Sequence, residues 1–332
     1  MRYLVLALAL AFCFAETALA ELPAFYGNVS RVIWVARDVD SVIEKWEKIG
    51  LQDVRRDGES AVAAEFRGEA VAGRVRRASG RLGGVAVDFV QPLTGGNAWA
   101  EFLEEHGDGI LALVYQAPDA EAHGREVRRL NGLGVAVLQR GTWLVEGGEL
   151  NYVLLDTEAG GKYVLGLAHG APAPPAAAPP AVRLSQYAFV IREFAPVSAY
   201  WERLGFPAFQ ITKSSVRDTR YRGKPVTYGQ ELGWQRHTPV AFEWCVPPPD
   251  LPGIYGEFLE KHGEGLQHLG FNVPEMDEAI ARYERLGLNV VLAGAWGEEG
   301  KPGSGRFAYI DTDAMGGVVV ELLWNYRAAP GN

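Results

Sequence analysis

The chain has 332 residues, of which 48% are hydrophobic and 22% are charged, a composition typical of a folded globular protein and not of a disordered one. The length predicts two domains, since a domain commonly has about 150 residues. With 41 acidic against 32 basic side chains, the formal net charge is −9. An acidic surface repels phosphate backbones and anionic headgroups, which disfavours nucleic acid and membrane surfaces as partners.

The first twenty residues have the pattern of a cleavable secretory signal. An early arginine precedes an apolar run from Leu4 to Ala15, and the sequence Ala-Leu-Ala ends at Ala20. The run is shorter than the roughly 20 apolar residues that a membrane span needs. We expect residues 1–20 to be removed and the mature protein to be secreted or periplasmic, without a membrane anchor. Cys245 then remains as the only cysteine, which excludes an intramolecular disulfide.

The rest of the chain contains a tandem repeat. The segment Ser41–Leu51 (SVIEKWEKIGL) resembles Pro196–Phe206 (PVSAYWERLGF), with Trp46 and Trp201 separated by 155 positions. Three further pairs follow in the same order at offsets of 155 or 156: VAVDFVQP with VAFEWCVP, FLEEHGDGI with FLEKHGEGL, and LLDTEAGGKYVLGL with YIDTDAMGGVVVEL. Four matches in order at a near-constant offset indicate a duplicated domain.

A low-complexity run, APAPPAAAPPA, separates the two copies at residues 171–181. Proline and alanine in this pattern predict an extended, semi-rigid spacer. We therefore divide the chain into a signal segment (1–20), a first domain (21–170), a linker (171–182) and a second domain (183–327).

Each domain contains a fainter internal repeat. In the second domain, the sequence Glu-Arg-Leu-Gly at residues 202–205 returns at residues 284–287, an offset of 82. Both stretches have helical apolar spacing, follow a short strand-like run and stop at glycine, which commonly ends a helix. Alternating segments such as FEWCV and VVVELL come after each helix and predict strands. The predicted unit is a strand, a helix and then several strands, used four times in an α+β fold.

The internal repeat gives four polar residues of the second domain related positions. His268 lies 82 positions after Gln186, and Glu243 and Glu321 lie in the last strands of the two units. If paired units curl their sheets into one cup, these side chains meet on its floor, where three oxygen donors and an imidazole suit a divalent ion. Taken singly, the histidine is more often a hydrogen-bonded core residue, and either glutamate could face solvent from an edge strand. A buried carboxylate, however, is costly unless it is paired or binds a metal.

The first domain lacks this set of ligands. The residues at the corresponding offsets are Arg31, Asp88, Ala112 and Gly166. Since only the aspartate is a metal ligand, we expect the first cup to be empty and structural. His106 and His262 are present in both copies, in HGDG and HGEG, so we assign them to loop geometry and leave His262 out of the metal set.

These features resemble the vicinal oxygen chelate superfamily, which includes glyoxalase I, methylmalonyl-CoA epimerase and the extradiol dioxygenases. The resemblance covers almost all of the mature chain, and HGEGLQHLGF and GGVVVEL carry it most strongly. It implies four βαβββ modules paired into two glyoxalase-like domains. It also implies one divalent ion (Zn, Ni, Co, Mn or Fe) with Gln186, Glu243, His268 and Glu321 as ligands. By similarity to glyoxalase I, Glu321 is the catalytic base, with Glu243 as the alternate.

The resemblance implies a metal-dependent isomerase, epimerase or lyase that removes a proton next to a carbonyl of a small oxygenated substrate. Two alternatives stay open: an extradiol-type ring-cleaving dioxygenase, and a non-catalytic protein that binds a small molecule. The dioxygenases of the superfamily use a His-His-Glu triad, whereas Gln186 stands in the place of the first histidine. The sequence does not indicate an oligomeric state.

Two groups of side chains are candidates for the walls of the cup. The stretch Lys213–His237 is rich in basic and aromatic residues: Arg217, Arg220, Tyr221, Arg222, Lys224, Tyr228, Trp234 and Arg236. A charged hairpin is usually a solvated face, and the alternative is a basic lip that attracts an anionic substrate. Trp324 and Tyr326 either form a wall of the cup or belong to the core.

Overall fold

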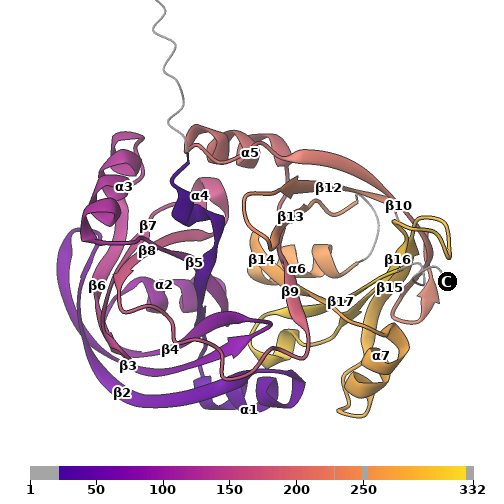
Figure 1. Cartoon of the computed structure of the whole chain (residues 1–332), viewed down its shortest axis with the longest axis horizontal. Helices are drawn as coiled ribbons and strands as arrows, with labels where there is room; N and C mark the ends of the chain where they lie inside the picture. The colour runs from indigo at the N-terminus through magenta and orange to yellow at the C-terminus, as the bar shows by residue number, and fades with distance from the viewer. Residues whose placement is uncertain (1–21, 228, 249–252, 327–332) are drawn as a thin grey trace, which may run out of the picture.

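The computed structural model describes residues 22–227, 229–248 and 253–326. The predicted signal segment, residues 1–20, lies outside them. The described chain forms two curved sheets of strands that lie side by side, with the N-terminal half on the left and the C-terminal half on the right of Figure 1. Among these residues, no helix is long and apolar enough to cross a membrane.

The first sheet is a closed ring with the strand order β1-β4-β3-β2-β6-β7-β8-β5. Its elements in chain order are η1 (Ala24–Gly27), β1 (Val29–Val35), α1 (Val39–Ile49), β2 (Gln52–Phe66), β3 (Glu69–Leu82), β4 (Val85–Thr94), α2 (Ala98–Glu105), β5 (Gly109–Gln116), α3 (Ala120–Gly132), β6 (Val137–Val145), β7 (Gly148–Leu155), α4 (Glu158–Gly161) and β8 (Val164–Gly170). Strand β1 pairs in parallel with β4 and antiparallel with β5, which pairs in parallel with β8.

The second sheet repeats this plan in the order β10-β12-β13-β9-β14-β17-β16-β15, and pairing of β15 with β10 closes it into a second ring, with β11 attached to β10. Its elements are β9 (Arg183–Val190), α5 (Phe194–Arg203), β10 (Gln210–Tyr221), β11 (Lys224–Pro225), β12 (Gly229–Gln235), β13 (Ala241–Cys245), α6 (Ile254–His262), β14 (Gly265–Asn272), α7 (Met276–Glu284), β15 (Val290–Trp296), β16 (Gly305–Ile310), η2 (Asp313–Met315) and β17 (Val319–Asn325). The predicted α+β fold of paired units is confirmed.

The first long helix shows how the sequence determines an element. In α1 the buried side chains recur at helical spacing, and the Asp38 carboxylate caps the N-terminus by accepting a hydrogen bond from the backbone N–H of Ser41. The helix ends at Gly50, whose φ of 130° is disfavoured for a residue with a side chain. Its tryptophan, Trp46, is 1% exposed and packs into the core.

A shared hydrophobic core joins the two rings. Helix α1 of the first ring contacts η2 of the second, and Trp46 Nε1 donates to the carbonyl of Met315 at 2.7 Å. Helix α5 of the second ring contacts α4 of the first, and Trp201 Nε1 donates to the carbonyl of Gly161 at 3.1 Å. The two helices lie at opposite ends of the boundary between the rings (Figure 1). The equivalent tryptophans of the repeat therefore make equivalent contacts across this boundary.

The repeated histidines also meet at this boundary, in agreement with their assignment to loop geometry. The Nδ1–H of His106 donates to the carbonyl of His262 at 2.8 Å, and the reverse hydrogen bond measures 2.7 Å. On their other side, Nε2 of His106 lies 3.2 Å from Glu158 and Nε2 of His262 lies 3.1 Å from Asp313. Hydrogen bonding to Glu158 raises the pKa of His106 to about 9.

This shift predicts a loss of stability at alkaline pH. The folded pKa of His106 exceeds the value of about 6.5 for an unfolded histidine. Its contribution is therefore fully present below about pH 6.5 and is lost as the pH rises through 9. We expect the difference in unfolding free energy between wild type and His106→Gln to shrink by about 2–3 kcal/mol from pH 6 to pH 10 in thermal unfolding measurements. Glu158→Gln should weaken the same pH dependence, and a constant difference across this range would contradict the assignment.

Candidate metal centre

The strand register brings the four predicted ligands to the floor of the second ring. Gln186 on β9 pairs with Gly270 on β14, and Gly270 pairs with Glu321 on β17. One pleat along, His268 on β14 pairs with Ala188 on β9, and the same alanine pairs with Glu243 on β13. Residues that face each other across neighbouring strands lie on the same face of a sheet. The symmetry expected from the offset of 82 is therefore present in the pairing of the strands.

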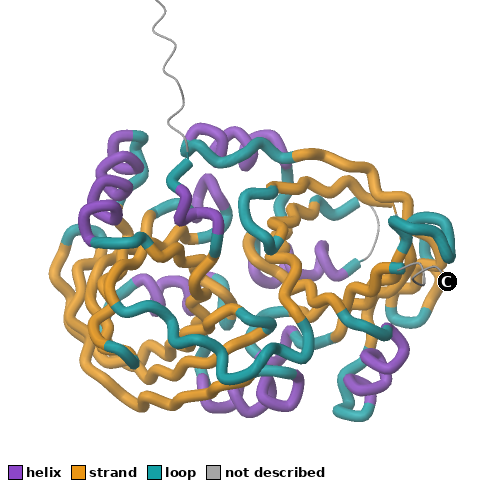
Figure 2. The backbone as a smooth tube through the Cα atoms, in the orientation of Figure 1, coloured by secondary structure: helices purple, strands orange, loops and turns teal. Residues whose placement is uncertain are grey.

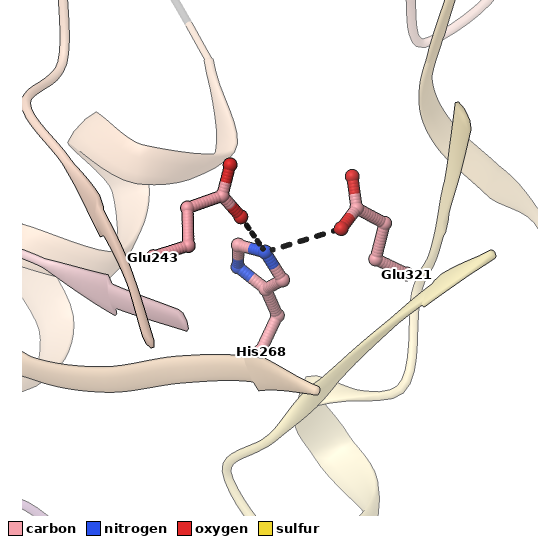
Figure 3. Close-up of side chains that lie close together, drawn as sticks. All are labelled: Glu243, His268 and Glu321. Atoms are coloured by element: carbon pink, nitrogen blue, oxygen red, sulfur yellow. Dashed lines mark ion pairs between the residues drawn. The ribbon is translucent and has the colours of Figure 1, made fainter. Parts of the chain in front are cut away.

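Three of these side chains converge on one point (Figure 3). His268 Nε2 lies 3.3 Å from an oxygen of Glu243 and 3.5 Å from an oxygen of Glu321, and all three residues are buried. One ligand atom from each lies within 4.8 Å of the others, and this is the one such histidine, cysteine and carboxylate cluster in the described part of the chain. Two carboxylates and an imidazole at this spacing can hold a divalent ion.

The side-chain atoms that could bind a metal ion form no well-aligned hydrogen bond in the described part of the chain. Gln186 Oε1, Glu243 Oε2, His268 Nε2 and Glu321 Oε2 are all buried and lack a hydrogen-bond partner in good geometry among the described residues. Burial of polar atoms without partners costs free energy, and a bound cation removes that cost. Gln186 Oε1 lies directly over Gly270, at a place that a Cβ would fill. The glycine thus leaves room for this side chain to extend across β14.

The orientation and charge of His268 fit the same interpretation. Its Nδ1 contacts Gln267 Oε1 at 2.5 Å, which holds the proton on Nδ1 and points Nε2 at the carboxylates. Burial alone lowers the pKa of His268, but Glu243 and Glu321 outweigh burial and raise the pKa to about 9. Burial also raises the pKa of Glu243, and His268 opposes this shift. The cluster therefore stabilises a positive charge between two buried carboxylates.

A cavity of about 580 Å³ opens above the cluster. Gln186, Glu243 and Glu321 line its floor. Its walls are partly apolar and aromatic, with contributions from Val216, Leu232, Trp234, Leu292, Trp296 and Phe307. A small molecule in this cavity would meet the candidate metal ligands on one side, and on the others walls that mix apolar side chains with polar ones such as Lys213, Asn272 and Asn325.

Two tyrosines of the cavity wall were not predicted from the sequence. The hydroxyls of Tyr255 and Tyr309 lie 2.8 Å apart, and both rings contact the ring of His268. Tyr309 faces Glu321 in the pairing of β16 with β17. Tyr309 begins the repeated segment YIDTDAMGGVVVEL, but its counterpart in the first copy is Leu154, so the repeat did not mark the tyrosine as a site residue. Pairing with the last strand was the signal that would have placed Tyr309 beside the glutamate.

The predicted basic lip is much smaller than its sequence suggests. Arg236 lines the cavity and stacks on Trp234, with its guanidinium carbon 4.8 Å from the ring centre. Arg217 instead contacts Asp218 and Glu299, and Arg222 pairs with Glu257. Tyr228 lies outside the described residues. Most of the hairpin is thus a surface whose charges are locally paired.

Of the two places that the sequence left open for Trp324, the structure excludes the wall of the cup. Side chains alternate between the two faces of a strand, so the face of β17 that carries Glu321 also carries Leu323 and Asn325. Trp324 and Tyr326 line a different depression, and Trp324 Nε1 donates to the carbonyl of Pro274.

The first ring has a different chemistry at the equivalent place. Arg31 pairs with Asp88 at 2.9 Å, and both side chains are buried. Ala112 and Gly166 occupy the positions of His268 and Glu321, as the registers of β5 and β8 show. The first cup was expected to bind no metal and to be structural, and the structure places this ion pair in it. A guanidinium replaces the amide of Gln186, and its positive charge compensates the one remaining carboxylate.

Comparison with known proteins agrees with this arrangement. Residues 185–309 match the model of the Glyoxalase/Bleomycin resistance protein/Dioxygenase superfamily. A variant of 4-hydroxymandelate synthase from Streptomyces coelicolor aligns with a TM-score of 0.62 and 16% identity, over 92% of this chain and 94% of that chain.

No curated protein matches the sequence. A second solved structure is similar to this chain over half of its own length. It is a fusion of a xylose isomerase-like TIM barrel with 4-hydroxyphenylpyruvate dioxygenase, with a TM-score of 0.51 and 12% identity over 92% of this chain and 50% of that chain. At these identities the similarity shows the fold. The second ring, with its buried Glu-His-Glu cluster, therefore contains a segment that matches the model of the glyoxalase/bleomycin resistance/dioxygenase superfamily, and the chain has a two-domain fold similar to that of hydroxymandelate synthase.

Proposed function

We propose that the protein is a metal-dependent isomerase, epimerase or lyase that removes a proton next to a carbonyl of a small oxygenated substrate. The observation that carries the proposal is the group of four buried oxygen and nitrogen atoms that have no hydrogen-bond partner outside their own cluster, on the floor of a cavity of about 580 Å³. Gln186, Glu243, His268 and Glu321 would hold one divalent ion, of Zn, Ni, Co, Mn or Fe. When bound, such an ion supplies Lewis-acid chemistry that polarises a carbonyl.

Glu321 is the proposed base and Glu243 its alternate. Both carboxylates line the cavity and lie beside His268, so either reaches a substrate that is held above the floor. A base must lie within hydrogen-bonding reach of the proton that it takes. The hydroxyls of Tyr255 and Tyr309, 2.8 Å apart, line the same cavity and are placed to orient oxygen atoms of the substrate.

The donor set favours this reaction class over oxygenation. A glutamine occupies the first ligand position, and the set then contains one imidazole and two carboxylates. The ring-cleaving dioxygenases of the superfamily use two histidines and one glutamate as ligands, one histidine more than this set contains. A dioxygenase and a non-catalytic binding protein remain the competing functions.

The direct test is hydrogen exchange with deuterated solvent. Purified mature protein, loaded with each candidate ion in turn, is incubated with small hydroxyaldehydes and hydroxyketones in deuterium oxide, and exchange at the carbon next to the carbonyl is followed by proton NMR. We expect metal-dependent exchange without oxygen uptake. Oxygen consumption that matches turnover would favour the dioxygenase instead. Saturable binding with neither exchange nor turnover would favour the binding protein.

We also propose that the protein is exported, which narrows the range of substrates. Acyl-CoA and glutathione adducts are chiefly cytoplasmic, so export favours a small hydroxy-carbonyl compound. The signal pattern predicts cleavage after Ala20 and a mature chain that begins at Glu21. Intact-mass measurement of the exported protein checks this prediction, and a mass that includes residues 1–20 would contradict it.

A further inference from the structure

The first ring contains a cavity of its own, of about 250 Å³, in the place that corresponds to the metal cup. Arg31 and Asp88, the counterparts of Gln186 and Glu243, line it. Three more arginines also line it: Arg55, Arg77 and Arg81. The duplication has therefore produced two cavities at equivalent positions, one lined by candidate metal ligands and one lined by guanidinium groups.

The guanidinium of Arg31 has hydrogen-bonding capacity that the protein does not use. Arg31 is 3% exposed, and one terminal nitrogen donates to Asp88 at 2.9 Å. Its Nε and its second terminal nitrogen are buried and have no partner among the described residues. A guanidinium presents five N–H donors in a fixed plane that matches the two oxygens of a carboxylate or phosphate group. Leaving charged donors unpaired inside a protein is costly, which points to a partner that is not part of the chain.

Arg77 provides a second buried positive charge in the same cavity. It is 7% exposed, and its guanidinium carbon lies 4.5 Å from the ring centre of Trp143. Its nearest carboxylate, Asp57, is 3.8 Å away, too far for a good hydrogen bond. Burial lowers the pKa of Arg77, although Asp88 and Asp57 oppose this shift. The buried floor thus carries two arginines and one aspartate, an excess of one positive charge.

The acidic side chains at the rim of this cavity already have partners. Asp57 lies 2.9 Å from Arg55, and Glu146 lies 3.4 Å from the same arginine. The carboxylate of Asp53 accepts a hydrogen bond from the backbone N–H of Ala177 in the linker at 3.1 Å. The lining as a whole is neutral, with four arginines and four carboxylates, but three of the carboxylates lie on the exposed rim, so the excess of positive charge is confined to the buried floor.

The linker forms part of the cavity wall. Arg81 donates to the carbonyl of Pro174 at 2.7 Å, and residues 172–175 together with Ala177 line the cavity. Figure 2 shows the linker as a loop that passes across the first ring before β9 begins. The segment predicted as a spacer is thus fastened to the first domain, next to the guanidinium groups.

We propose that the cavity of the first ring binds a small oxyanion, a carboxylate or phosphate group, between Arg31 and Arg77. The unpaired N–H groups of Arg31 donate to its two oxygens, and Arg77 supplies the second positive charge. The volume of about 250 Å³ limits the ligand to a small acid or an inorganic anion. This site is independent of the candidate metal centre and does not rest on the proposed function.

Isothermal titration calorimetry with sodium phosphate and sodium acetate tests the proposal. The titrations use the full mature protein at constant ionic strength, with chloride as the reference anion. We expect one saturable site per chain for at least one probe. Saturation by acetate alone identifies a carboxylate site, and saturation by phosphate alone identifies a phosphate site. The absence of saturable heat with both probes would overturn the proposal.

Variants at two residues locate the bound anion. Arg77→Met keeps a flexible side chain over Trp143 and removes the charge, and we expect it to weaken binding at least about tenfold. His268→Ala alters only the second ring and should leave the affinity unchanged. The opposite pattern, loss in His268→Ala and retention in Arg77→Met, would place the anion at the metal centre and overturn the proposal. Circular dichroism spectra and unfolding temperatures establish that each variant is folded, and Arg77→Lys, which keeps the charge, should retain part of the affinity.

Discussion

Replacement of His268 by alanine is expected to abolish stoichiometric binding of a divalent ion. The imidazole supplies the one nitrogen donor of the set and lies between the two carboxylates, at 3.3 Å from Glu243 and 3.5 Å from Glu321. Loss of residues that only support metal ligands typically costs 10- to 100-fold in affinity, so loss of this ligand should cost at least about 100-fold. Metal content per chain, measured by plasma mass spectrometry after dialysis, gives the result directly. An unchanged metal content would show that the ion, if present, binds elsewhere.

The matched control lies at the equivalent position of the first ring. Asp88→Asn keeps an oxygen that accepts from Arg31 and should leave the metal content unchanged, because Arg31, Ala112 and Gly166 provide no other ligand. Asparagine is preferable to alanine, since removal of one partner of a buried ion pair typically costs about 3–5 kcal/mol. Loss of metal from a folded Asp88→Asn protein would mean that the two domains had been equated wrongly.

Replacement of Glu321 by glutamine is expected to lower turnover by about 10²–10⁴, the usual contribution of general-base catalysis. Glutamine has nearly the same shape and keeps one oxygen, but it has no negative charge and does not accept a proton. The metal should still bind, with reduced affinity. The measurements are the rate of hydrogen exchange next to the substrate carbonyl and the metal content of the same sample.

Excess metal ion separates the two roles open to Glu321. If Glu321 is only a ligand, the activity of the Glu321→Gln variant should return when the concentration of the ion is raised to saturation. If it is the base, activity should stay low in the saturated protein. Glu243→Gln is the natural companion, because Glu243 lies on the opposite side of His268 and is the alternate base. If the metal-saturated Glu243→Gln variant loses more turnover than the metal-saturated Glu321→Gln variant, Glu243 is the base and Glu321 is the ligand.

The repeat made much of this site predictable. An offset of 82 related Gln186 to His268, and the strand register shows that their positions are in fact related by the pairing of β9 with β14. Comparison with the first copy also distinguished candidate ligands, which the second copy alone contains as a set, from residues with a structural role, which both copies contain. His106 and His262, which both copies contain, hydrogen-bond across the boundary between the rings.

Other parts of the site depend on packing that no local pattern specifies. Tyr309 and Trp324 both follow strand patterns, yet one contacts the ring of His268 and the other lies on the opposite face. Arg222 and Arg236 belong to the same charged hairpin, but only Arg222 meets a carboxylate, Glu257, in space. Whether an arginine is neutralised depends on residues that are distant in sequence. For the same reason, the sequence assigned Arg31 a structural role and did not show that some of its N–H groups have no hydrogen-bond partner.

The contacts across the boundary between the rings limit which parts of the protein can be lost in evolution. Tyr163 of the first domain stacks on Trp201 of the second at 4.6 Å, while Trp46 of the first inserts against Met315 of the second. Each domain thus finishes the interior of the other, and removal of either would expose a large apolar surface to water. The first domain can therefore lack a set of metal ligands and still not be dispensable. Selection for folding alone would keep this domain in place, so its cup is free to have a chemistry different from that of the second domain.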